Sequence, residues 1–147
     1  MKAAASAGCY KEKGIPNRIM NVDPIIAVSD VEASSAWYQA IFDCKSIHGG
    51  PDFDVLATSR GDVMLCLHKW GEDDHPTLYD PGIPVGNGLL LYFRTKNIEQ
   101  LWAKVVSLDL VILKELAVSD NSHVKEFSLR DLDGYYLTIA EHHTFGS

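Results

Sequence analysis

The chain has 147 residues, which suits one domain with its own core and excludes two independent full-size domains. Hydrophobic residues make up 46% and charged residues 22%, which is the composition of a globular protein and not of a disordered or fibrous chain. Thirteen Lys and Arg against twenty Asp and Glu give a net charge of −7, which argues against nucleic acid or an anionic membrane as a partner. The acidic surface is either a solvated exterior or a means of attracting cationic small molecules.

The cysteines and the start of the chain indicate where the protein resides. Cys9, Cys44 and Cys66 are odd in number and form no Cys-x-x-Cys pair, which favours a reducing compartment, so a cytoplasmic location is expected. No apolar run reaches about 18 to 20 residues and the first residues lack an apolar signal region, so neither a membrane helix nor export is expected. Residues 1–19 show no regular period and are predicted to form a flexible extension, with Met20 as an alternative natural start.

The first half of the chain predicts a strand, a helix and then further strands. A β-branched run at residues 21–28 predicts the first strand, and Asp30 supplies an N-cap for a helix that ends near residues 43–45. The strands expected after this helix cover residues 53–58 and 63–68, and residues 44–48 could add a short one. Residues 71–88 are rich in Gly, Pro and acidic side chains, and they predict a long connecting loop.

The second half of the chain predicts the same order of elements. Residues 89–94 form a predicted strand, and Asn97 is an N-cap with Gln100 three residues later, at the start of a helical stripe. The strands expected after this helix cover residues 110–113, 124–129 and 135–140. A turn at residues 131–134 joins the last two strands.

Matching offsets support an internal repeat. Asp30-Val31-Glu32 in the first half corresponds to Asn97-Ile98-Glu99 in the second. The repeat predicts an α+β fold of two tandem βαβββ modules, although a generic α+β domain could show two similar units by chance. The predicted organisation is one domain over residues 20–143, with modules at about 20–70 and 88–143, a linker at 71–88 and a tail at 144–147.

Three motifs connect this domain to a known family. They are Val28-Ser29-Asp30 before Trp37-Tyr38, Leu91-Tyr92-Phe93 before Asn97-Ile98-Glu99, and Lys125-Glu126-Phe127 before Asp131-Leu132-Asp133-Gly134-Tyr135. The domain resembles the vicinal oxygen chelate superfamily, which includes glyoxalase I, extradiol dioxygenases and the bleomycin and fosfomycin resistance proteins. The last motif looks most like the bleomycin-resistance-type branch, although Leu132 departs from the usual proline. The resemblance implies a curved, partly open mixed sheet and a homodimer.

The resemblance also implies positions for a metal site. Enzymes of this superfamily chelate one divalent metal with four side chains, usually His, Glu or Gln, which the repeat places at Asp23, Leu65, Leu90 and Thr138. A leucine has no lone pair, a threonine hydroxyl is a poor ligand, and one aspartate alone does not hold a catalytic cation. We therefore expect no metal and no other cofactor.

Other reactive side chains favour structural roles. Strand alternation predicts that Leu65 and Leu67 face the cavity while Cys66 and His68 face away from it. Cys66 lies in an apolar run, which is typical of an inert core thiol. The chain contains neither a Gly-x-Ser-x-Gly motif nor a glycine-rich phosphate loop before a helix.

The predicted ligand cavity is mostly apolar and aromatic. Its wall and stacking faces comprise Asp23, Ile25, Leu65, Leu67, Trp70, Leu90, Tyr92, Arg94, Phe127, Tyr136 and Thr138. Small-molecule pockets are lined in this way, and Trp70 and Phe127 would offer faces for a planar or cationic ligand. Alternatively, the same side chains fill the barrel as ordinary core.

The sequence leaves three candidate functions for this domain. The first is a metal-free binding protein of the glyoxalase/bleomycin resistance type that sequesters an aromatic or cationic small molecule, such as an antibiotic or toxic compound. The second is a glyoxalase-I-like lyase or isomerase, which needs a metal as Lewis acid. The third is a non-catalytic module whose barrels are filled. Because the metal ligands are missing, the sequence favours the first function and argues against an enzyme.

Overall fold

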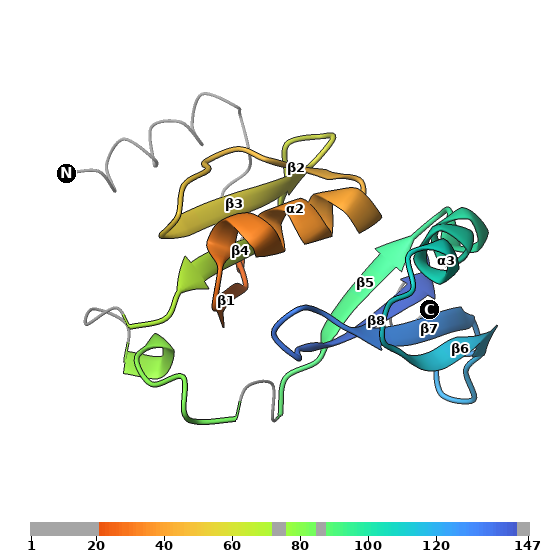
Figure 1. The fold of residues 1–147 in the computed structure, drawn as a ribbon. Coiled ribbons are helices and arrows are strands. Elements are labelled where there is room, and N and C mark those ends of the chain that lie inside the picture. Colours follow the sequence, from red (N-terminus) through yellow and green to blue (C-terminus); the bar gives the residue numbers. More distant parts are fainter. Residues whose placement is uncertain (1–20, 72–75, 85–87, 144–147) are drawn as a thin grey trace.

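The computed structural model describes residues 21–71, 76–84 and 88–143, and it arranges them as two successive βαβββ modules (Figure 1). The first module contains β1 (Ile25–Val28), α2 (Val31–Ile41), β2 (Cys44–Ser46), β3 (Phe53–Thr58) and β4 (Val63–Lys69). The second contains β5 (Leu91–Thr95), α3 (Ile98–Ser107), β6 (Ile112–Val118), β7 (Lys125–Arg130) and β8 (Tyr136–Glu141). A short 3-10 helix, η1 (Pro76–Leu78), lies in the linker. The predicted extension at 1–19 and tail at 144–147 lie outside the described residues.

Each module is built on a four-stranded mixed sheet. The strand orders are β1-β4-β3-β2 and β5-β8-β7-β6, so the two modules share one topology. In each sheet the first strand runs parallel to the last, and the remaining neighbours are antiparallel. The predicted α+β fold of two tandem βαβββ modules is confirmed.

Most strand boundaries and the end of α2 differ from the sequence prediction by a few residues, and two of these differences have a clear physical reason. Helix α2 stops at Ile41 and not at residues 43–45, because the backbone of Phe42 is already extended, with φ −99° and ψ 159°. Strand β6 begins later and runs further than predicted. Its exposed Lys114 and Glu115 break the apolar alternation that marks a half-buried strand, which is why the sequence pattern missed its length.

The predicted helix caps have different outcomes. The Asp30 carboxylate accepts a hydrogen bond of 2.9 Å from the backbone N–H of Ala33, so the predicted cap of α2 is confirmed. Asn97 precedes α3 as predicted, but its side chain makes no capping hydrogen bond. Its backbone N–H donates instead to the hydroxyl of Thr95 at 3.1 Å.

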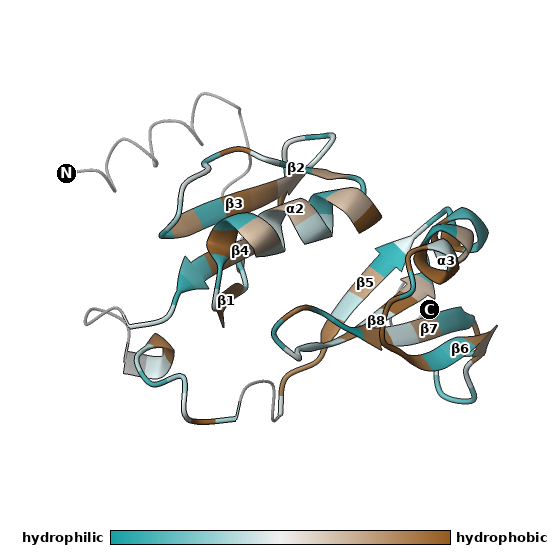
Figure 2. Cartoon of the chain, viewed as in Figure 1, coloured by the Kyte–Doolittle hydropathy of each residue, from teal (hydrophilic) through white to brown (hydrophobic). Residues whose placement is uncertain are grey.

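Apolar side chains between each helix and its sheet form the core, and Figure 2 shows hydrophobic segments along the strands and helices of both modules. In the first module Leu56, Leu65 and Leu67 are fully buried. In the second module Phe127 is fully buried and its ring centroid lies 5.0 Å from that of Trp102 on α3. Among the residues that the structure describes, no helix is both long and apolar enough to span a membrane.

The turn between β7 and β8 ties the second module to the first. The Tyr38 hydroxyl on α2 donates to the Asp131 carboxylate at 2.7 Å, and the Tyr135 hydroxyl donates to the Ala27 carbonyl at 2.8 Å. Asp133 accepts from both the backbone N–H and the hydroxyl of Ser29, at 2.9 and 2.8 Å. Gly134 supplies the positive φ of 94° that this turn requires. The motif that closes the sequence repeat is therefore also a joint between the modules.

Candidate functional site

The pairing register shows which face of each sheet its helix covers. In the first module Asp54 pairs with Leu67, and the Ser35 hydroxyl on α2 donates to the Asp54 carboxylate at 2.6 Å. Leu67, and Leu65 two residues earlier, therefore face α2 and belong to the core. Cys66 and His68 lie on the opposite face, which we call the helix-free face.

The sequence prediction placed Leu65 and Leu67 on the cavity side of β4, whereas the structure places both on the side of α2, and Leu65 also lines the pocket described below. The run Met64-Leu65-Cys66-Leu67 is apolar on both faces, so alternation shows which residues share a face but not which face the helix covers. The helix-free face of the first module carries Ile25, Ala27, Phe53, Val55, Cys66 and His68.

The helix-free face of the second module is more polar. Tyr92 pairs with Thr138, which pairs with Ser128, while the neighbouring row of Phe93, Ile139 and Phe127 faces α3. The hydroxyls of Ser128 and Thr138 lie 2.9 Å apart and both residues are buried. This face carries Tyr92, Arg94, Glu126, Ser128, Thr138 and Ala140.

A hydrogen-bonded group of side chains borders this polar face. The Tyr92 hydroxyl lies 3.0 Å from His143 Nε2, and Arg94 Nη1 donates to the His143 carbonyl at 2.6 Å. Burial and the nearby Glu126 carboxylate raise the pKa of the Tyr92 phenol, so this phenol stays protonated at neutral pH. It can therefore donate a hydrogen bond.

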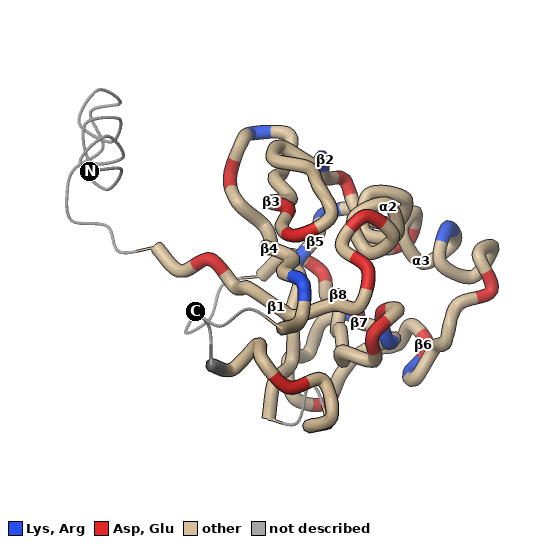
Figure 3. The backbone as a smooth tube through the Cα atoms, turned by 60° about the vertical axis from the view of Figure 1, so that its left-hand side comes forward, with Lys and Arg blue, Asp and Glu red and all other residues tan. Residues whose placement is uncertain are grey.

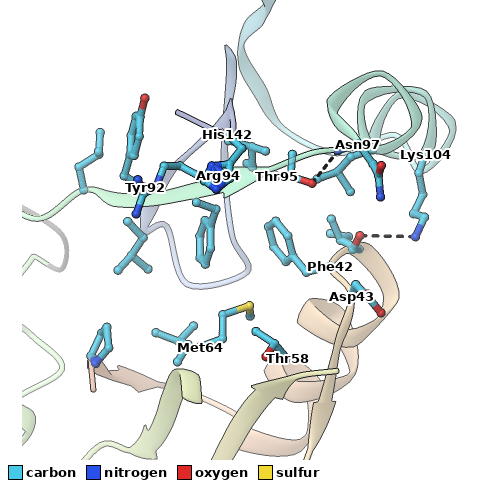
Figure 4. A pocket seen from close by; sticks show the side chains of 18 of the residues that line it. Phe42, Asp43, Thr58, Met64, Tyr92, Arg94, Thr95, Asn97, Lys104 and His142 are labelled. Atoms are coloured by element: carbon cyan, nitrogen blue, oxygen red, sulfur yellow. Dashed lines mark hydrogen bonds between the residues drawn. The ribbon is translucent and has the colours of Figure 1, made fainter. Parts of the chain in front are cut away.

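A pocket of about 850 Å³ lies between the two modules (Figure 4). It is lined by Pro24, Ile41, Phe42, Asp43, Thr58, Val63, Met64, Leu65, Leu89, Leu90, Leu91, Tyr92, Phe93, Arg94, Thr95, Asn97, Gln100, Leu101, Lys104, Ile139 and His142. Every residue of β5 takes part, because β5 is an edge strand and the pocket runs along its unpaired side. The volume is within the range of small-molecule sites.

The pocket combines an aromatic floor with a polar rim. The rings of Phe42 and Phe93 stack across the module boundary, with centroids 4.8 Å apart and an interplanar angle of 27°. At the rim, Lys104 Nζ donates to the carbonyl of Ile41 at 3.5 Å, and the Asp43 carboxylate lies beside this end (Figure 4). The arrangement suits a ligand with a planar or apolar body and polar groups.

Four of the predicted wall residues line this pocket. They are Leu65, Leu90, Tyr92 and Arg94. Sequence reasoning missed Phe42 and Phe93, because it took the wall from alternate strand residues of a barrel and not from the boundary between modules. Phe42 directly follows the end of α2 at Ile41, whereas the sequence prediction placed it inside the helix, so the sequence offered no signal for its place in the pocket.

The remaining predicted wall residues lie elsewhere. Leu67 and Phe127 are fully buried in the core, and Thr138 is buried and bonded to Ser128. Asp23 and Ile25 are exposed at the start of the first module. Trp70 directly follows β4, and the Tyr136 ring on β8 lies 5.8 Å from the Arg130 guanidinium.

The residues at the implied metal positions do not fit a divalent cation. Leu65 and Leu90 offer no donor atom, and the Thr138 hydroxyl is already bonded within the sheet. Cys66, the next residue after Leu65, lies on the helix-free face and has a donor atom. However, burial raises the pKa of its thiol, which disfavours the thiolate that binds metals. In residues 21–71, 76–84 and 88–143, no group of three or more His, Cys, Asp or Glu side chains could hold a metal ion.

Comparison with protein families gives one match. Residues 16–139 match the model described as the Glyoxalase/Bleomycin resistance protein/Dioxygenase superfamily, which is most of the chain. No curated protein matches the chain.

Comparison with solved structures shows the same fold. TioX from Micromonospora sp. ML1 is 13% identical with a TM-score of 0.64, covering 84% of this chain and 100% of its own. A protein of unknown function from Agrobacterium tumefaciens str. C58 is 18% identical with a TM-score of 0.69, covering 88% and 98%. A glyoxalase/bleomycin resistance protein/dioxygenase family enzyme from Burkholderia phytofirmans PsJN is 20% identical with a TM-score of 0.67, covering 82% and 98%.

Proposed function

Because the chain belongs to the Glyoxalase/Bleomycin resistance protein/Dioxygenase superfamily, we propose that it is a metal-free small-molecule-binding protein of this fold. Its role would be to sequester an aromatic compound such as an antibiotic or toxic molecule. The observation that carries the proposal is the pocket of about 850 Å³ whose floor is the stacked pair Phe42 and Phe93. A planar ligand would stack on this floor while the rim orients it.

The residues at the implied metal positions support a function that needs no metal. Sequestration needs only affinity and shape, whereas a glyoxalase-I-like lyase or isomerase needs a Lewis acid. We therefore expect elemental analysis of dialysed protein to find no stoichiometric zinc, nickel, iron or manganese. A metal retained at one per chain would instead support the lyase or isomerase.

We further propose that the protein is a cytoplasmic homodimer. Exposed apolar side chains lie at two edge strands. Ile25 at the start of β1 is 46% exposed, and Leu90, which directly precedes β5, is 49% exposed. Apolar area of this kind beside an unpaired strand is suited to a contact with a second copy. Analytical ultracentrifugation should find twice the mass of the chain.

The binding function is tested with planar aromatic compounds of neutral, anionic and cationic charge. At least one class should raise the melting temperature and give a saturable signal in titration calorimetry. Leu90→Trp places an indole at the pocket wall and should weaken that binding. Leu132→Trp makes the same change at an exposed leucine outside the pocket and should leave binding unchanged.

Two outcomes count against this function. If no class binds, the filled module of the third hypothesis is favoured. If the two tryptophan variants weaken binding equally, the ligand does not occupy this pocket.

A further inference from the structure

The two modules meet at the joint and at the pocket floor, and the segment of helix α2 takes part in both contacts. Tyr38 on α2 belongs to the joint, where its hydroxyl donates to the Asp131 carboxylate of the second module at 2.7 Å. Phe42 directly follows α2 and forms the pocket floor with Phe93 of the second module. Tyr38 itself does not line the pocket. These two contacts between the modules therefore lie about one helical turn apart along the chain.

The aromatic rings form a continuous stack from the joint to the pocket floor. The centroids of the Tyr38 and Phe42 rings lie 5.8 Å apart with an interplanar angle of 24°, and those of Phe42 and Phe93 lie 4.8 Å apart at 27°. The backbone N–H of Phe42 also donates to the Tyr38 carbonyl at 2.8 Å. Because Tyr38 and Phe42 are both buried and closely packed, a displacement of the Tyr38 ring is passed on to Phe42.

The second module holds both ends of this stack. Asp131 Oδ1 accepts hydrogen bonds of 2.9 Å from the backbone N–H groups of Asp133 and Tyr135, so the carboxylate is fixed within its own turn. Its Oδ2 accepts from the Tyr38 hydroxyl. Burial raises the pKa of the Tyr38 phenol, which therefore stays protonated and donates this bond. Asp131 thus holds the stack at the joint, and Phe93 holds it at the pocket.

We propose that Tyr38 is a positioning residue for the pocket: its hydrogen bond to Asp131 keeps Phe42 stacked on Phe93 and so holds the pocket floor in the shape that binds a ligand. This inference rests on the proposed function, and it adds a residue that acts on the ligand only through its neighbours. A floor that is ordered before binding costs less free energy to order when the ligand arrives, so loss of the hydrogen bond should lower the affinity. Because coupling between two sites is reciprocal, a bound ligand should in turn strengthen the joint.

The test titrates three probes calorimetrically into the full chain at pH 7. They are 2-naphthalenesulfonate, 2-naphthamide and 2-naphthylmethylammonium, which share one ring system and keep their charges from pH 7 down to about pH 4. Tyr38→Phe keeps the buried ring and removes only the hydroxyl. It should weaken binding of the tightest-binding probe about fivefold or more.

Ser35→Ala is the matched control on the same helix. It also removes a hydroxyl that donates to a buried carboxylate, that of Asp54 at 2.6 Å, but both residues belong to the first module and neither lines the pocket. Ser35→Ala should therefore lower the stability and leave the affinity within about twofold of the wild type. A loss of affinity in Tyr38→Phe alone then shows that the effect comes from the position of the bond and not from overall stability.

The pH dependence of binding is a second readout, which a purely structural role of Tyr38 would not change. Burial raises the pKa of Asp131, whose carboxylate is faced by the Tyr38 phenol from α2 and, on its own turn, by Asp133 and Tyr135. Because Oδ1 already accepts two N–H groups, a proton enters at Oδ2 and weakens the bond from Tyr38. The affinity is therefore full above this raised pKa and is lost as the pH falls through it, between pH 7 and about pH 4.

Other carboxylates titrate in the same range, since Figure 3 shows acidic residues spread over both modules, with fewer and scattered basic ones. The affinity is therefore compared at each pH between the wild type and Tyr38→Phe, and the variant should lose less affinity on acidification. Asp131→Asn, which removes the charge and nearly keeps the shape, serves as a second variant if Tyr38→Phe does not fold. It should bind more weakly than the wild type and show the same reduced dependence on pH.

The outcomes separate this inference from the proposed function. If Tyr38→Phe binds as tightly as the wild type, or if Ser35→Ala weakens binding equally, the inference is overturned while the binding function stands. If the affinities of the wild type and Tyr38→Phe fall in parallel with pH, the role of Asp131 is overturned. If no probe binds to the wild type, the result counts against the proposed function and against the inference that rests on it.

Discussion

The two modules share a topology but differ on their helix-free faces. In the first module this face presents Ile25, Phe53 and Cys66, which are mainly apolar groups. In the second module the corresponding positions carry hydroxyls and charges, as at Tyr92 and Thr138. The helix-facing sides of both sheets are packed with buried apolar residues.

This difference separates what maintains the fold from what distinguishes the modules. A helix must cover apolar residues on one face of its sheet in either module, so that face is constrained by packing. The opposite face is not covered by a helix of its own module, so its residues can differ in chemistry without loss of the fold. The following variants test this division.

The largest effect is expected at the helix-facing core of the second module. Phe127→Ala removes a fully buried ring that packs on Trp102, and it should lower the free energy of unfolding by about 3 to 5 kcal/mol. Chemical denaturation measures the change. A loss below about 1 kcal/mol would mean that the helix-facing side is not the main source of stability.

A smaller effect is expected at the joint between modules. Tyr38→Phe keeps the buried ring but removes the hydroxyl that donates to Asp131, so a buried carboxylate loses a partner. The free energy of unfolding should fall by about 1 to 3 kcal/mol, measured by denaturant titration. Ser29→Ala, which removes an exposed donor to Asp133, is the milder control. Equal losses in the two variants would contradict a special role for the buried bond.

A fall in pH should destabilise the first module through the Asp54 carboxylate. The second module has apolar residues at the corresponding place. Burial disfavours the charge of Asp54, but hydrogen bonds from Ser35, Gly49, Ser46 and Val55 outweigh this and lower its pKa. A lowered pKa means that the stability is present above the ordinary pKa of about 3.9 and is lost as pH falls through the native value. Between neutral pH and about pH 3, Asp54→Asn should therefore show a shallower loss of stability than the wild type. A parallel loss in both proteins would assign acid unfolding to other groups.

Much of the fold could be predicted because it depends on local signals. The Asp30 cap, the apolar strands and the Asp-x-Asp-Gly turn each act within a few residues, and the repeat of these signals gave the two modules. The β6 strand was misplaced because an edge strand with exposed charged residues has no apolar period.

The site was predicted less well, because it depends on how elements pack together. Alternation fixed which residues of β4 share a face, but the helix-facing side became clear only from the bond between Ser35 and Asp54. The stacked pair of Phe42 and Phe93 joins residues from two modules, and no spacing within one module indicates such a contact.

The smallest effect on stability is expected on the polar helix-free face. Tyr92 is half-buried and lines the pocket, so Tyr92→Ala should lower the free energy of unfolding by about 1 kcal/mol. Its neighbour Phe93 is also half-buried, but it lies on the opposite face and stacks on Phe42, so Phe93→Ala should cost more. The same two variants should both weaken binding of an aromatic probe, because both residues line the pocket. Denaturation and calorimetric titration of this pair therefore separate folding from binding at adjacent positions of one strand. If Tyr92→Ala destabilises the protein more than Phe93→Ala and leaves binding unchanged, Tyr92 belongs to the core and the division between the two faces does not hold.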